Sequence, residues 1–119
     1  MPNSSLPAVN WTELVAACGA DEALARTVTA EFAIQVTPQV ELLSTSISSG
    51  HTRAALTAAH KLKGSVLAIF ASRAAEYVRQ LENALRNNED PTNLLNRIII
   101  EAELVRHECT RLSSDIHPT

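Results

Sequence analysis

Apolar residues recur at intervals of three and four along most of the chain, which is the period of an amphipathic α-helix. One stripe follows Asp21 and runs through Pro38 without a break, which favours a single kinked helix over two abutting helices. A second stripe lies within 52–71, where Thr52 is a candidate helix cap. The two stripes are Leu24, Val28, Phe32, Val36, Val40, Leu43 and Ile47, and then Ala55, Ala59, Leu62, Val66 and Ile69.

Two further segments show the same period. The segment 73–86 has an apolar face of Ala74, Val78, Leu81 and Leu85, and its outer positions are Arg73, Glu76, Arg79, Glu82, Asn83 and Arg86. Asp90 and Pro91 then give a strong start signal for a last helix. Its seam comprises Leu95, Ile98, Ala102, Val105, Cys109, Leu112 and Ile116.

A shorter pattern precedes these four segments. Asn10 and Glu13 have the spacing of a capping box, and the residues that share one face are Trp11, Leu14, Val15 and Cys18. We therefore predict an all-α protein, an antiparallel four-helix bundle (up-down-up-down) with a short N-terminal clasp helix. Residues 1–9 are predicted to be a flexible lead-in, and residues 10–117 a single domain.

Composition agrees with a helical fold. The 119 residues are 45% hydrophobic but only 3% aromatic, with three glycines. This composition predicts an aliphatic core and argues against a β-sheet. No apolar run is long enough to span a membrane. The two cysteines are isolated, which favours a reduced, cytoplasmic setting, and both are predicted to be structural. A net charge of -3 argues against nucleic-acid binding. We expect a monomer.

The distribution of charge changes this picture locally. No acidic residue lies between Glu41 and Glu76, whereas the cations in that interval are Arg53, Lys61, Lys63 and Arg73. The pattern predicts a cationic face that would attract a phosphoryl group or an acidic partner, unless the acids are absent by chance.

His60 lies within that interval, nearly opposite the apolar stripe of its helix. Its neighbours on the outer face are Leu56, Thr57, Lys63, Gly64 and Leu67. A neutral imidazole is nucleophilic near pH 7, so His60 suits covalent carriage of a transferred group. Lys63 could neutralise a phosphoryl group, and Gly64 leaves room for a partner's active site. Partner-binding residues are predicted to be Arg53, Leu56, Thr57, Lys61, Gly64 and Leu67, with both leucines exposed.

Other chemistries have less support. The remaining histidines, His51, His107 and His117, have no cluster around them, and no spacing resembles a metal motif, so we predict no metal site. No carboxylate lies within four residues of His60, which argues against acid-base catalysis. An isolated solvent-exposed histidine would be the simplest alternative, but the grouped features favour function.

The stretch from His60 to Ser65, HKLKGS, resembles the H-x-L-K-G-S signature of histidine-containing phosphotransfer (HPt) domains of two-component phosphorelays. The similarity extends to GADEAL before the first long helix and RAAEYVRQLENALRN after the motif. It implies that His60 accepts a phosphoryl group from a receiver-domain aspartate and passes it to another receiver, with Lys63 as phosphate-side cation and Gly64 as clearance position. The implied partners are a response-regulator receiver domain, a hybrid sensor histidine kinase, or both. Mg²⁺ is expected only in the receiver, and no cofactor in this chain.

One position departs from that family. Phe70 stands where members usually have glycine, ten residues beyond the histidine, and could pack as a plug under the bend. The chain has no glycine-rich nucleotide loop, so the resemblance implies a phosphocarrier rather than a kinase or phosphatase. Two alternatives stay open: a helical adaptor that binds a receiver or another signalling partner without phosphotransfer, and a metal-dependent or hydrolytic enzyme, which is least favoured.

Overall fold

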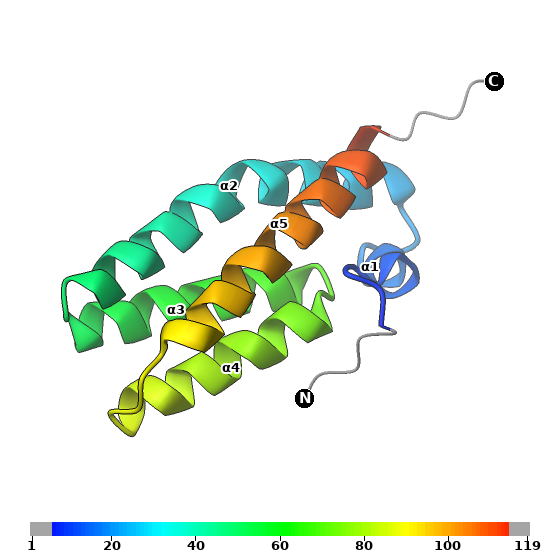
Figure 1. Cartoon of the computed structure of the whole chain (residues 1–119). Helices are drawn as coiled ribbons and strands as arrows, with labels where there is room; N and C mark the ends of the chain where they lie inside the picture. Colours follow the sequence, from blue (N-terminus) through cyan, green and yellow to red (C-terminus); the bar gives the residue numbers. More distant parts are fainter. Residues whose placement is uncertain (1–5, 115–119) are drawn as a thin grey trace.

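The computed structural model describes residues 6–114, which form five α-helices and no strand. Four long helices, α2 (Glu22–Ser48), α3 (Thr52–Ala68), α4 (Ser72–Arg86) and α5 (Thr92–Ser114), pack side by side (Figure 1). Consecutive helices are neighbours and α5 returns to α2, which closes a four-membered ring. The predicted all-α bundle is therefore confirmed. No helix in the described part is long and apolar enough to cross a membrane.

The short helix α1 (Trp11–Ala17) lies across one end of the bundle (Figure 1). Asn10 caps it by accepting a hydrogen bond from the Glu13 amide at 3.1 Å, as predicted, and Leu14 is buried. Residues 1–5 of the predicted lead-in lie outside the described part. Within the remainder, Val9 is buried and the Leu6 carbonyl accepts a hydrogen bond from Arg73. Residues 6–9 are thus bound to the bundle.

Helix α2 is continuous through Pro38, and Asp21 caps it as expected. Its predicted stripe is only partly right, because Leu24 is exposed. Residues four apart advance about 40° beyond a full turn, so a stripe with that spacing drifts around the helix. The buried positions of α2 are Ala25, Thr29, Phe32, Val36, Leu43 and Ser46.

The other stripes form the core. All five predicted positions of α3 are at most 1% exposed, and the four of α4 are buried as well. Along α5 the seam is buried from Ile98 to Leu112, including Cys109, while Ile116 lies outside the described residues. Thr52 was wrongly predicted as the cap of α3. His51 occupies that position, without a side-chain capping hydrogen bond.

Four helices end in the same backbone motif. After the last turn of α1, α2, α3 and α4, a residue with positive φ donates its amide to a carbonyl three residues back, and the next residue bonds five residues back. The residues that donate to the carbonyl three positions back are Gly19, Gly50, Phe70 and Asn88, and Ala20, which follows Gly19, has positive φ as well. Phe70 is thus the only large side chain of the four. It is half-buried against the core, and its carbonyl accepts a hydrogen bond from the Asn10 amide.

Candidate functional site

Helix α3 places His60 on its solvent side, because Ala59 and Leu62 turn inward to the core. The His60 side chain is 77% exposed, whereas Ala59 and Leu62 are at most 1% exposed. The imidazole is therefore accessible to another protein, as the sequence predicted.

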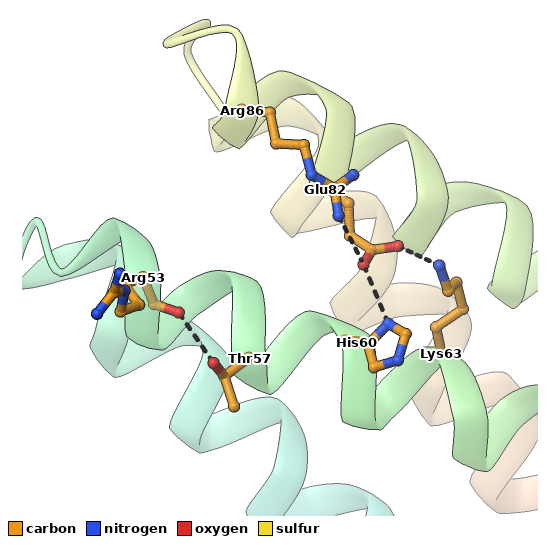
Figure 2. Close-up of polar contacts among 6 residues, drawn as sticks. All are labelled: Arg53, Thr57, His60, Lys63, Glu82 and Arg86. Atoms are coloured by element: carbon orange, nitrogen blue, oxygen red, sulfur yellow. Dashed lines mark hydrogen bonds and ion pairs between the residues drawn. The ribbon is translucent and has the colours of Figure 1, made fainter.

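A buried carboxylate from the neighbouring helix points toward this histidine (Figure 2). Glu82 of α4 is 1% exposed, and its Oε1 atom accepts a 2.6 Å hydrogen bond from Lys63 Nζ. Its Oε2 atom lies 3.6 Å from His60 Nδ1 and 3.7 Å from an Nη atom of Arg86. Three cationic or titratable side chains thus converge on one buried carboxylate.

The position of Glu82 corrects the sequence analysis, which placed this residue outside the bundle. Glu82 follows Leu81 directly and lies at the edge of the apolar face of α4, turned toward α3. Glu82 is 22 positions from His60 in the sequence, so spacing within one helix does not bring the two residues together. The sequence does contain a signal for this contact: Glu82 is a single acidic residue next to the apolar stripe. A carboxylate in such a position needs a buried cationic or hydrogen-bonding partner.

Glu82 also changes the interpretation of Lys63. The lysine was predicted to face a phosphoryl group, but its ammonium group is engaged with Glu82 and its side chain is only 25% exposed. Removing Lys63 would leave a buried charge short of its closest partner. Lys63 therefore has a structural role in this state of the protein.

The Oε2 atom of Glu82 can influence which nitrogen of the His60 ring carries the proton. Oε2 is buried and has no hydrogen-bond partner among the described residues. At 3.6 Å from Nδ1 it is slightly beyond hydrogen-bond range, and a small side-chain rotation would close the gap. A proton on Nδ1 would then point at the carboxylate, which leaves the lone pair on the outward Nε2 atom.

Two predicted contact positions lie on the surface beside His60: Gly64, which leaves open space, and Leu67, which is apolar. A Cβ atom built on Gly64 would meet nothing within 4 Å, so the packing of this chain does not demand glycine there. Leu67 is 51% exposed, as predicted. Leu56 was wrongly predicted to be exposed, since it is half-buried and packs against the core. Leu67 is therefore the more accessible of the two leucines for docking.

The remaining predicted contacts follow the same helix toward its N-terminus. Arg53, Thr57 and Lys61 are exposed, and the Thr57 hydroxyl donates to the Arg53 carbonyl (Figure 2). Arg73 does not belong to this cationic surface. Its Nε atom donates a 2.9 Å hydrogen bond to buried Glu101 of α5, on the other side of α4.

Among residues 6–114, no three histidine, cysteine, aspartate or glutamate side chains gather where they could hold a metal ion. His51 and His107 are described and lie away from His60, at the start of α3 and on α5. His117 lies outside the described residues.

Comparison with known proteins matches this chain to one family. A sequence model described as "Hpt domain" matches residues 27–115. The histidine-containing phosphotransfer protein B from Pseudomonas aeruginosa PAO1 is similar in structure, with a TM-score of 0.83 and 19% identity, over 95% of this chain and 100% of that one. The HPT domain of a sensor hybrid histidine kinase from Shewanella gives a TM-score of 0.78 and 16% identity, over 93% and 97%. No curated protein sequence gives a significant match.

Proposed function

Because this chain belongs to the Hpt domain family, whose members carry phosphoryl groups in phosphorelays, we propose that His60 accepts a phosphoryl group from the aspartate of a receiver domain. The group then passes to the aspartate of a second receiver. The observation that carries this proposal is the exposed imidazole above a buried carboxylate. Hpt domains interact with receiver domains and histidine kinases, so the partner is a receiver on its own or within a hybrid kinase.

The transfer needs a nucleophile with a free lone pair. Nε2 of His60 attacks the phosphorus of the aspartyl phosphate, an N–P bond forms, and the P–O bond to the aspartate breaks. The aspartate leaves as a carboxylate with the bonding electron pair. The ring, which keeps its Nδ1 proton, becomes a phosphorylated imidazolium. Attack by the second receiver's aspartate reverses these changes.

Glu82 would act as a positioning residue in both directions. Its Oε2 atom faces Nδ1, so its negative charge favours the proton on that nitrogen and offsets the positive charge that develops on the ring. Because Glu82 is only 1% exposed, water screens this interaction less than it would screen a pair of surface groups. Among residues 6–114, no acidic cluster could hold the Mg²⁺ that activates a phosphoryl group. In the proposal the receiver supplies carboxylates and Mg²⁺.

The remaining side chains would serve the approach of the partner. Gly64 leaves space beside the ring, Leu67 offers apolar contact, and Arg53 and Lys61 attract an acidic active site. Lys63 lies one turn from His60 and reaches a phosphoryl group only by loosening its hold on Glu82. Arg86, which is 57% exposed, remains close to the carboxylate if that happens.

The test is transfer from a receiver domain that carries ³²P-phosphate on its aspartate. We expect the purified chain to acquire a label that is lost in acid and stable in alkali. His60→Gln should abolish the label, whereas His107→Gln, which removes an exposed histidine on α5, should keep it. No label on the wild type, or undiminished label on His60→Gln, would overturn the proposal.

Receiver-binding measurements on the wild type and variants distinguish an adaptor from a phosphocarrier. Binding of the unphosphorylated receiver should survive His60→Ala, while Gly64→Arg and Leu67→Asp should weaken it because both obstruct the docking surface. Receiver binding that follows this pattern without any label on the wild-type chain would assign the adaptor function.

A further inference from the structure

A second concave surface lies between α2 and α5. It encloses about 640 Å³. Val36, Val40 and Ala102 form an apolar floor, and Ile99, which is 41% exposed, extends the apolar surface along α5. Apolar floors with polar edges are typical of grooves that accept a ligand or a peptide. None of the residues that line this α2–α5 groove belongs to α3.

The groove is separate from the histidine site. The contacts among the helices place the α2–α5 pair opposite the α3–α4 pair, and His60 and Glu82 belong to the latter. A molecule in the groove would therefore leave the imidazole accessible.

Charge indicates what kind of partner fits. The two charged residues that line the groove are both acids, Glu41 on α2 and Glu103 on α5. Glu103 accepts a 2.9 Å hydrogen bond from Arg106, which holds the pKa of its carboxyl below the ordinary value. Glu41 has no ion-pair partner among residues 6–114. The α3 surface carries Arg53 and Lys61 instead, so the two faces attract partners of opposite charge.

We propose that the α2–α5 groove docks a basic amphipathic helix of a partner protein. A helix laid between α2 and α5 would place apolar side chains, spaced three and four residues apart, on Val40 and Ile99. A lysine or arginine side chain at its edge would meet Glu41, because Glu103 is already paired with Arg106. The occupied groove would tether this protein to a third component while His60 exchanges phosphoryl groups with receivers.

The experiment titrates the full chain, labelled with ¹⁵N, with a synthetic amphipathic helix of about 15 residues that has leucine on one face and lysine on the other. A matched peptide replaces every lysine with glutamate. At physiological ionic strength, where charges beyond about 8 Å are screened, we expect saturable shifts in the amides that line the groove, and none with the acidic peptide.

Two pairs of variants separate docking from general attraction. Glu41→Lys should weaken binding about fivefold, as expected for reversal of one exposed charge, whereas Glu31→Lys makes the same charge change on α2 outside the groove and should have no effect. Ile99→Asp should weaken binding about tenfold, and Ile34→Asp, at a 76% exposed position of α2, should not.

Phosphotransfer provides the last readout. Saturating basic peptide should leave the rate of labelling of His60 unchanged. Amide shifts concentrated on α3, equal losses in Glu41→Lys and Glu31→Lys, or no saturable binding would each overturn the proposal, and none of these results depends on whether His60 accepts phosphate.

Discussion

The Nδ1 atom of His60 lies 3.6 Å from the Oε2 atom of Glu82, a carboxylate oxygen that is buried and has no hydrogen-bond partner in the described residues. A buried carboxylate is costly unless it is paired with a cation or hydrogen-bonded. Lys63 offsets that cost through Oε1. The second oxygen is thereby left available to the imidazole.

Glu82→Gln tests whether the charge matters to transfer. The amide keeps the size of the side chain and can still accept a hydrogen bond, but a bond to a neutral acceptor is about half as strong as one to a carboxylate. We expect phosphotransfer to His60 to slow about tenfold, measured as the initial rate of labelling by a phosphorylated receiver.

The control for this variant is Glu89→Gln, which removes an exposed carboxylate from the turn after α4. It should transfer at the wild-type rate. If Glu82→Gln keeps its helical circular dichroism and also transfers at that rate, the positioning role of Glu82 is wrong.

The Lys63–Glu82 pair should also hold α3 against α4. Lys63→Met leaves the buried carboxylate with only Arg86 and His60 nearby, at 3.7 and 3.6 Å, and should lower the free energy of unfolding by about 2 kcal/mol. Urea denaturation measures this change. The double variant Lys63→Met with Glu82→Leu removes both charges and should recover most of the loss.

This double variant separates stability from chemistry. It should be folded and stable, yet transfer phosphate slowly, because the ring has lost its carboxylate and the site has lost the Lys63 ammonium group. A Lys63→Met protein as stable as wild type would mean that Glu82 reaches solvent or another cation, contrary to its 1% exposure.

The sequence predicted the face of each helix better than the contacts between helices. The apolar period of α3 identified its five core residues and the outward direction of His60, because a helix repeats every 3.6 residues wherever it lies. Glu82 escaped this reasoning. Its burial depends on how α4 is rotated against α3, and a single-helix pattern does not contain that rotation.

Two smaller errors concern residues at the border of an apolar stripe. Leu56 lies at the border of the α3 stripe, and the neighbouring helices cover it enough to make it half-buried. Leu24 belongs to the spacing of the α2 stripe but drifts out of the core, since steps of four residues overshoot a turn. The helix caps at Asn10 and Asp21 were predicted correctly, because each cap depends only on residues within the next turn.

Cys109 should be inert in the folded protein. It is fully buried in the α5 seam, and this burial raises the pKa of its thiol to about 12. The thiolate is the reactive form, so Ellman's reagent at pH 8 should titrate half-buried Cys18 first and Cys109 only after unfolding. Equal rates for the two thiols in the native state would contradict the packing of α5.

The same thiol predicts a loss of stability in alkali. Its pKa is raised on folding, so the unfolded chain releases this proton first, from about pH 9. The free energy of unfolding should therefore be unaffected by this group below pH 9 and fall as the pH rises from about 9 to about 12. Cys109→Ala, compared with wild type across that range, should lack this part of the decline.

Phe70 occupies a left-handed backbone position, with φ of 58°, at the turn from α3 to α4. Side chains strain this conformation, and glycine relieves the strain by about 1 kcal/mol. Phe70→Ala should lose the packing of the ring and keep the strain, whereas Phe70→Gly loses the packing and removes the strain. We therefore expect Phe70→Gly to be more stable than Phe70→Ala by about 1 kcal/mol in urea denaturation, the reverse of the order inside a helix.

Gly50 allows the cost of backbone strain in this motif to be measured separately from side-chain packing. It has φ of 71° in the same motif at the end of α2, and a Cβ atom there would meet nothing within 4 Å. Gly50→Ala should thus lose about 1 kcal/mol through backbone strain alone. If that loss matches the difference between the two Phe70 variants, the phenylalanine is retained for its contact with the core beneath the turn, at the expense of a strained backbone. If Phe70→Ala is the more stable variant, the left-handed conformation at residue 70 is not what limits this turn.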